Sequence, residues 1–319
     1  NYHKITLIDK FFSHKIITIY LLEIFYHPIY TSGISKSSSF PRDRYQLIFD
    51  SILKSNQDKN IVFKTPKKIN LKHLYRVHQK KYVDQFLDGT LPESQQRKIG
   101  LRPWTSKIIE RTLFIMGGSV NAVTSSLENG ASANLAGGTH HAYYDYGSGY
   151  CVFNDLVISA YYCKEKFKRY QNILILDLDV HQGDGTASMV KTDKSIFTFS
   201  MHCETNFPLK KQISDLDVPL KKGMKDKTYL RILGSSLEKL EDNDTDIIFF
   251  QAGVDGLVHD TLGHLELSHN GMIKRNEMVL NFCKKQGCPI VIFMGGGYSK
   301  PISQTVKAFS KLFFQFSNF

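Results

Sequence analysis

Short apolar segments recur along the chain and are separated by longer segments with helical periodicity. The apolar segments are four to seven residues long, and most are rich in Ile, Val, Leu and Phe, which is typical of buried β-strands. They cover 22–26, 60–63, 132–136, 172–178, 195–200, 246–251 and 289–294. Because the strongest of them are apolar at nearly every position, they predict strands covered on both faces, as in a parallel sheet.

Helical patterns lie between these strands, at 71–87, 105–128, 155–170, 226–240, 268–285 and 301–314. Alternation of strand and helix is the pattern of an α/β fold. No internal repeat or low-complexity linker divides the chain, and the Ser-rich segment 31–39 and the polar segment 89–102 are expected to be loops. The sequence therefore predicts one α/β domain at 22–319, with a mainly parallel β-sheet flanked by helices, and an N-terminal extension of unknown role at 1–21.

The charge balance suggests an anionic partner, but the pattern of the charges argues against it. The 319 residues include 41 Lys and Arg and 30 Asp and Glu, a formal net charge of +11. An excess of this kind suits nucleic acid or a membrane surface. The densest basic runs, 64–72, 164–169 and 221–227, are short and lack the interleaved aromatic residues of a single-strand binding groove. No direct nucleic-acid binding is therefore expected.

Cysteine usage and hydropathy indicate a soluble protein of a reducing compartment, which points to the cytoplasm. The five cysteines are odd in number and lack a CxxC spacing, so neither a disulfide framework nor a Cys-zinc site is indicated. Residues 5–25 are apolar in part, but charged residues interrupt them and no membrane span is expected. Because the chain begins with Asn1 and not with Met, a targeting segment could have preceded it.

Polar or glycine-rich segments follow five of the predicted strands directly. They are GGTHH at 137–141, DLDVHQGDG at 177–185, SMH at 200–202, AGVDG at 252–256 and GGGY at 295–298. The carboxyl ends of parallel strands meet at one edge of a sheet, and ligands of open α/β sheets bind at that edge. The sequence therefore predicts one site built from residues over 150 positions apart.

The aspartate-rich segment has the spacing of a metal site. Asp177, Asp179, His181 and Asp184 follow one another at spacings of two, two and three. Side chains at i and i+2 of a strand end point to the same side, so Asp179 and His181 can share a ligand. With Asp255 they would offer two carboxylates and one imidazole and leave positions open for water and substrate, as catalytic sites do. The alternative interpretation of the aspartates is turn and capping chemistry after a strand.

Two further segments carry candidate catalytic side chains. His140 and His141 are adjacent and follow two glycines, so two imidazoles can meet one reacting group. Taken alone, they could equally be an ordinary histidine pair. Tyr298 follows three glycines and could present its phenol to a developing oxyanion. The alternative is a phosphate-binding glycine loop, against which stands the lack of a GxGxxG or P-loop spacing.

The motifs GGTHHAYYDYGSGYCVFND, ILDLDVHQGDGT, FQAGVDGLVHDTLG and MGGGY together resemble the histone deacetylase and acetylpolyamine amidohydrolase superfamily. A narrower similarity, to class IV histone deacetylases and their bacterial relatives, rests on NLAGGTHHA, FPRDRYQLI at 40–48 and TFSMHCETNFP. It also rests on Gln182, which stands where many other members have a second histidine. The resemblance spans about residues 22–305. It implies an arginase/deacetylase-like three-layer fold.

By position, the resemblance implies roles for individual residues. Asp179, His181 and Asp255 match the zinc ligands, His140 and His141 the tandem histidines, and Tyr298 the tyrosine that polarises the carbonyl. Asp177 and Asp184 match the carboxylates that orient His140 and His141, and Asp177 and Ser200 match a structural potassium site. Gly149, Tyr150, Phe207 and Leu262 match the lining of the acyl-lysine tunnel.

The activity implied is zinc-dependent hydrolysis of N-acyl amides. Fe²⁺ could replace Zn²⁺, since two carboxylates and an imidazole form a harder site than thiolates do. The expected substrate is an acyl-lysine in a protein, and the alternative is a small acylated amine such as an acetylpolyamine. An inactive scaffold or acyl-lysine reader would also keep the pocket, but the intact set of ligands, histidines and tyrosine argues against it. The sequence indicates no oligomeric state.

Overall fold

The fold is described by a computed structural model that covers residues 21–57, 59–317 and 319. The expected N-terminal extension, apart from Leu21, lies outside the described residues. Within them, eight strands form one sheet in the order β2-β1-β3-β8-β7-β4-β5-β6, and every neighbouring pair is parallel. The strands are β1 (Leu22–Phe25), β2 (Ile61–Lys64), β3 (Ala131–Asn134), β4 (Ile173–Asp177), β5 (Ile196–Cys203), β6 (Leu216–Leu220), β7 (Ile247–Gln251) and β8 (Ile290–Phe293).

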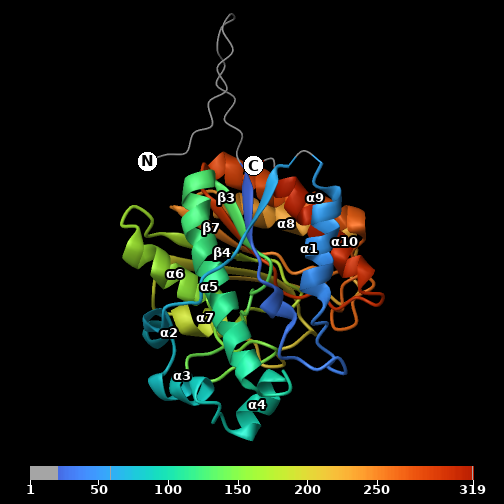
Figure 1. Cartoon of the computed structure of the whole chain (residues 1–319). Helices are drawn as coiled ribbons and strands as arrows, with labels where there is room; N and C mark the ends of the chain where they lie inside the picture. Colours follow the sequence, from blue (N-terminus) through green and yellow to red (C-terminus); the bar gives the residue numbers. More distant parts are fainter. Residues whose placement is uncertain (1–20, 58, 318) are drawn as a thin grey trace, which may run out of the picture.

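Helices cover both faces of the sheet (Figure 1). They are α1 (Arg44–Ser55), α2 (Leu71–Val77), α3 (Lys80–Leu87), α4 (Glu93–Ile99), α5 (Ser106–Asn129), α6 (Asp155–Lys166), α7 (Asp184–Val190), α8 (Asp226–Leu240), α9 (His269–Gln286) and α10 (Ser303–Phe316), with a 3₁₀ turn η1 (Pro28–Thr31). The helices α5 and α6 pack on one face, and α1, α8, α9 and α10 form the layer on the other. The predicted three-layer α/β fold is confirmed.

The central strands are apolar on both faces because both faces are covered. All five residues of β4 and of β7 are buried, and Phe249, Phe250 and Phe293 have no exposed side-chain surface. Residues like these stabilise a fold by roughly 1.5–3 kcal/mol each when fully buried. The strands β3, β8, β7 and β4 are consecutive neighbours at the centre of the sheet. Their carboxyl ends therefore lie side by side.

All seven predicted strands are present, but one strand was missed. The eighth strand, β6, lies at the sheet edge and pairs only with β5. It contains Pro219, which cannot donate a ladder hydrogen bond and is tolerated at an edge. Its residues are mostly half-buried, so it lacks the continuous apolar run of the central strands. A pattern of continuous apolar residues therefore does not predict this strand.

Two expectations about helices and loops were wrong, and two further helices were not predicted. The segment 71–87 is two helices, because His78 is extended and its ring contacts the carbonyl oxygen of Tyr143 and the N–H of Asn154. The expected loop at 89–102 contains α4, which ends at Gly100 in the left-handed conformation that glycine favours. The helices α1 and α7 were not predicted, since they lie in segments interpreted by their motifs alone.

Close packing of α5 rests on a glycine, and this generates a prediction. A Cβ added to Gly117 would lie 1.8 Å from the carbonyl oxygen of Lys67, a backbone atom that cannot easily move. We expect Gly117→Ala to destabilise the fold by roughly 1–3 kcal/mol through overpacking. Gly234, within α8, is the matched control, because its added Cβ would meet only the end of Met278 at 3.4 Å.

Thermal unfolding followed by circular dichroism measures the difference. Gly117→Ala should lower Tm by at least about 2 °C. Gly234→Ala should leave Tm unchanged or raise it, because alanine is favoured over glycine in a helix by roughly 0.5–1 kcal/mol. Equal Tm values for the two variants would contradict the packing argument.

Candidate active site

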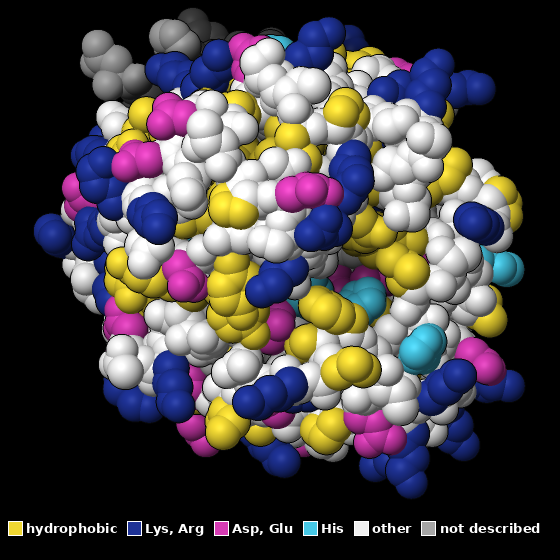
Figure 2. Space-filling model, turned by 90° about the horizontal axis from the view of Figure 1, so that it is seen from below, with side chains coloured by type: hydrophobic (Ala, Val, Ile, Leu, Met, Phe, Trp, Pro, Cys, Tyr) yellow, Lys and Arg dark blue, Asp and Glu magenta, His cyan; other side chains and the backbone are white. Residues whose placement is uncertain are grey.

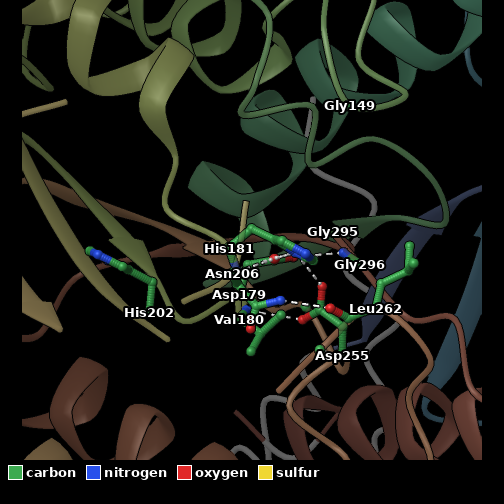
Figure 3. A network of polar contacts seen from close by, with 12 residues as sticks. Gly149, Asp179, Val180, His181, His202, Asn206, Asp255, Leu262, Gly295 and Gly296 are labelled. Carbon is green, nitrogen blue, oxygen red and sulfur yellow. Dashed lines mark hydrogen bonds and ion pairs between the residues drawn. The ribbon is translucent and has the colours of Figure 1, made fainter. Parts of the chain in front are cut away.

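Four of the five polar segments meet at the carboxyl edge of the sheet, as predicted. GGTHH follows β3, DLDVH begins at the end of β4, AGVDG follows β7 and GGGY follows β8. The fifth segment, SMH at 200–202, belongs to β5 itself because that strand continues to Cys203. Figure 3 shows the side chain of His202 pointing away from the cluster that the other segments form.

Asp179, His181 and Asp255 bring their donor atoms within 4.8 Å of one another, an arrangement that could hold a metal ion. Nδ1 of His181 lies 3.0 Å from Oδ1 of Asp179 and 3.0 Å from Oδ2 of Asp255 (Figure 3). Burial and the neighbouring Asp179 raise the pKa of Asp255 to about 7. Burial lowers the pKa of His181, but the two carboxylates outweigh burial and raise that pKa to about 10. The cluster therefore favours a positive charge between the two carboxylates.

Glycines allow the carboxylates to lie this close to the backbone. A Cβ on Gly296 would lie 1.8 Å from Oδ2 of Asp255, and a Cβ on Gly253 would lie 2.1 Å from Oδ2 of Asp179. The N–H of Gly296 instead donates to Oδ2 of Asp179 at 2.7 Å, and the N–H of Val180 donates to Oδ1 of Asp255 at 3.0 Å. The glycines of AGVDG and GGGY are thus required by the close approach of the carboxylates.

His140 and His141 each contact one carboxylate and face each other. Nδ1 of His140 lies 2.7 Å from Oδ2 of Asp177, and Nδ1 of His141 lies 2.6 Å from Oδ1 of Asp184. The two Nε2 atoms are 3.1 Å apart. Burial lowers the pKa of His140, but Asp177 and Asp179 outweigh it and raise that pKa to about 9. Burial and the neighbouring His140 lower the pKa of His141 to about 4, so the pair favours one charged and one neutral imidazole.

Tyr298 reaches the same pocket from the strand end next to Asp255. Its backbone N–H donates to Oδ2 of Asp260 at 2.6 Å, which fixes the turn after the three glycines. Its ring lies 5.8 Å from the ring of Tyr150 and under the guanidinium of Arg44. Burial raises the pKa of Tyr298 well above its ordinary value, so the phenol keeps its proton and can donate it in a hydrogen bond.

Of the four residues that the resemblance implies for the tunnel, Gly149 and Tyr150 line the cavity, and a tunnel role for all four stays a prediction. A Cβ on Gly149 would lie 2.8 Å from Cδ2 of His141, and the ring of Phe207 packs edge-on against His141 at 4.9 Å between centroids. Tyr150 lines the pocket, whereas Leu262 is more exposed and lies on the side of Asp255 (Figure 3). Figure 2 shows a hollow with acidic and histidine side chains at its floor and hydrophobic side chains around it.

Sequence reasoning missed the inner wall of the pocket. The cavity, of about 50 Å³, is also lined by Phe40, Arg44, Tyr45 and Arg111. Arg44 donates to the carbonyl oxygens of Gly295 at 3.0 Å and Gly297 at 3.1 Å, which ties α1 to the glycine turn. A signal existed in the sequence, because Arg44, Ile48 and Ile52 share one face of a helix at spacings of four and all three are buried.

Asp155 was also missed, although it positions the histidine segment. It is the first residue of α6, is fully buried, and accepts hydrogen bonds from the N–H of Gly138 at 3.0 Å and of Thr139 at 2.7 Å. The hydroxyls of Thr139 and Ser119 donate to it as well, each at 2.6 Å. This one carboxylate therefore holds the turn that directly precedes His140.

Asp177 and Ser200, the expected potassium residues, are partners in the register of β4 and β5. Oδ1 of Asp177 accepts from the N–H of Asp179 at 3.0 Å, and Oδ2 faces His140. The hydroxyl of Ser200 lies 3.0 Å from Nδ1 of His202. Potassium binding here stays a prediction.

Comparison with known proteins identifies the family of this chain. The family model for the histone deacetylase domain matches residues 38–312. An uncharacterized protein of Picosynechococcus sp. is 41% identical over 290 residues, which are 91% of this chain and 96% of that protein. Histone deacetylase 2 of Arabidopsis thaliana is 29% identical over 195 residues (60% of this chain, 50% of that protein), and histone deacetylase 1 of Homo sapiens is 28% identical over 257 residues (73% and 52%). The chain spans about half the length of these two named deacetylases.

A parallel α/β sheet with polar residues at the carboxyl ends of its strands is an architecture that binds ligands at that edge. The family match makes the class specific: the chain belongs to the histone deacetylase family and is a hydrolase. Members of this family typically depend on a metal. No helix among the described residues is long and apolar enough to cross a membrane.

The contacts of Asp155 generate a prediction about stability. In Asp155→Asn the amide nitrogen would face a hydrogen-bond donor, because the carboxylate receives donors on both oxygens. Each buried donor left without a partner costs about 1–3 kcal/mol. Asp215→Asn is the matched control, since Asp215 also accepts from the N–H and hydroxyl of a threonine, Thr198, but is exposed.

Thermal unfolding of the two variants decides the question. Asp155→Asn should lower Tm clearly more than Asp215→Asn, because water can replace the lost contact only at the exposed site. A smaller or equal effect at Asp155 would show that the turn before His140 does not depend on this carboxylate.

Proposed function

We propose that this protein hydrolyses N-acyl amides with a bound zinc ion, and that its substrate is an acyl-lysine in a protein. The observation that carries the proposal is the shared pocket: Asp179, His181, the two histidines and Tyr298 line one cavity. Asp255 joins Asp179 and His181 in the cluster that could hold a metal ion. Amide hydrolysis needs an electrophile, a base for water, a donor for the oxyanion and a proton for the amine. Each role has a candidate side chain here.

Asp179, His181 and Asp255 fit a divalent ion by the chemistry of their donors. Two carboxylate oxygens and one imidazole nitrogen converge on one point, and three protein ligands leave a position free for a small molecule. A zinc ion bound there would act as a Lewis acid on the acyl carbonyl and on water. Fe²⁺ suits the same donors, because the set contains no thiolate.

The chain's own groups carry the proton transfers. His141 takes a proton from the attacking water and later delivers it to the leaving amine, and Asp184 orients its ring. His140, held by Asp177, adjusts the charge beside it. The phenol of Tyr298 donates a hydrogen bond to the oxyanion as charge develops. We assign the channel for the acyl-lysine side chain to Gly149, Tyr150, Phe207 and Leu262, which is supported by the first two in the cavity lining and by the contact of Phe207 with His141.

The surroundings of the opening support a protein substrate over a polyamine. Five exposed large apolar residues belong to two loops beside the pocket: Phe207, Leu209, Ile213, Val258 and Leu262. The side chain of Asn206 joins these loops by donating to the carbonyl oxygen of Leu262 at 2.6 Å. Asp260, in the same loop as Leu262, already accepts from the N–H groups of Tyr298, Leu262 and Gly263. An acetylpolyamine is cationic and would need free carboxylates there.

Three finer assignments belong to the same proposal. Kinship with class IV deacetylases rests on the motifs around His140 and on Gln182, whose amide contacts both the backbone of Gln212 and Asp217. A structural potassium ion at Asp177 and Ser200 rests on their pairing between β4 and β5. A cytoplasmic location rests on five free, buried cysteines, which suit a reducing compartment.

Hydrolysis assays on the zinc-reconstituted protein test the activity. An acetyl-lysine peptide, a long-chain acyl-lysine peptide and an acetylpolyamine are compared before and after chelation. We expect peptide hydrolysis that chelation abolishes and zinc restores, and we expect His181→Ala to block the restoration, since a three-ligand site cannot easily lose a donor. Faster hydrolysis of the acetylpolyamine than of the peptides would show that the substrate is a small acylated amine and not a protein. Full activity without metal would overturn the mechanism.

Substitution of Tyr298 by Phe tests the oxyanion role. The change removes one hydroxyl and keeps the ring that packs beside Tyr150. Turnover should fall by about two to three orders of magnitude, while KM changes little, because the hydroxyl serves charge that is present only in the transition state. A raised KM at unchanged turnover would show that Tyr298 merely binds the substrate.

A further inference from the structure

Tyr143 contacts Asp184, the partner of His141, from outside the pocket. It lies two residues after His141, and its hydroxyl donates to Oδ2 of Asp184 at 2.9 Å. The other oxygen of this carboxylate, Oδ1, faces Nδ1 of His141 at 2.6 Å. Asp184 therefore receives a donor on each oxygen, one from the proposed base and one from Tyr143. The contact from Tyr143 has no part in the mechanism proposed above.

The position of the Tyr143 hydroxyl is fixed by several contacts. Its ring stacks on the ring of Tyr146 at 4.6 Å with 13° between the planes, and its N–H donates to the carbonyl oxygen of Tyr146 at 2.9 Å. Its own carbonyl oxygen lies 2.9 Å from Nδ1 of His78. Because Nε2 of His78 accepts from the N–H of Asn154 at 3.0 Å, Nδ1 must be the donor. Burial lowers the pKa of His78 to about 4, so this neutral form persists at neutral pH.

A buried carboxylate needs this second donor. Asp184 is 3% exposed, and a buried charged oxygen without a partner is costly. Its pKa is raised by burial but lowered further by the contacts to His141 and Tyr143, so the carboxylate stays ionised. If Oδ2 lost its donor, the carboxylate could rotate to find another. Oδ1 would then move away from Nδ1 of His141 and no longer orient that ring.

We propose that Tyr143 is a positioning residue for the hydrolysis, because its hydroxyl fixes Asp184 in the orientation that holds the His141 imidazole for proton transfer. This inference rests on the proposed function of His141. It assigns to Tyr143 no contact with the substrate or the metal. The alternative is that the hydroxyl only satisfies a buried acid and contributes to stability.

Tyr143→Phe removes the hydroxyl and keeps the stacked ring. Tyr75→Phe is the matched control, because Tyr75 also donates to a carboxylate, Oδ1 of Asp84 at 2.8 Å, but at an exposed position outside the pocket. We expect Tyr143→Phe to lower kcat about 3- to 10-fold, the worth of one hydrogen bond, and to leave KM and zinc content unchanged. Tyr75→Phe should change none of these.

A double-mutant cycle with Asp184→Asn separates positioning from stability. Asp184→Asn should lower kcat by itself, and Tyr143→Phe should add little in that background, because Tyr143 acts through Asp184. An unchanged kcat in Tyr143→Phe would overturn the proposal. So would a defect that multiplies in full with that of Asp184→Asn, or a rise in KM alone.

Failure of the proposed function gives a different result. If the zinc-loaded wild-type protein hydrolyses none of the three acylated substrates, that function is wrong, and the ¹⁵N spectrum of His141 then tests the positioning role. A change in the Nδ1 shift of His141 in Tyr143→Phe, with none in Tyr75→Phe, would support it. An identical spectrum in both variants would overturn it.

Discussion

The burial of several carboxylates at one edge of the sheet is the constraint on which the rest of the site depends. Asp179 and Asp255 are 1% and 0% exposed, and a buried charge costs several kcal/mol unless it is paired. Backbone N–H groups donate to both oxygens of Asp179 and to Oδ1 of Asp255. Oδ1 of Asp179 and Oδ2 of Asp255 also face Nδ1 of His181. A cation at this point would relieve the repulsion, and its binding would then stabilise this edge of the sheet.

Two buried arginines lie near the segments that carry these carboxylates. Arg275 is buried at 1% exposure and donates to the carbonyl oxygen of Gly253 at 2.6 Å, which places a positive charge beneath the acidic cluster. Burial lowers its pKa, while Asp255 and Asp179 act in the opposite direction. Arg44 holds the carbonyls of the glycine turn before Tyr298. Two arginines, from α9 and α1, thus fix the segments that follow β7 and β8.

His140 and His141 differ in pKa because different charged groups surround them. His140 lies near Asp177 and Asp179, whereas His141 lies near a single carboxylate and next to His140. The first imidazole therefore keeps its proton more readily than the second. A neutral ring that faces the pocket can accept a proton, and a charged neighbour can stabilise negative charge that forms beside it. Adjacent positions in the sequence thus acquire different chemistry from their surroundings.

The sequence by itself determined the central strands and the polar residues at their ends. Continuous apolar runs specify buried strands, and polar residues directly after them must lie at one edge, so Asp179, His181 and Asp255 could be grouped from local patterns alone. The edge strand β6 and the break at His78 could not be predicted, because partners distant in the sequence decide both. The same holds for the contacts of Arg44, Asp155 and Tyr143. Their partners come within hydrogen-bond distance only when helices pack on the sheet, so tertiary structure alone decided what those side chains do.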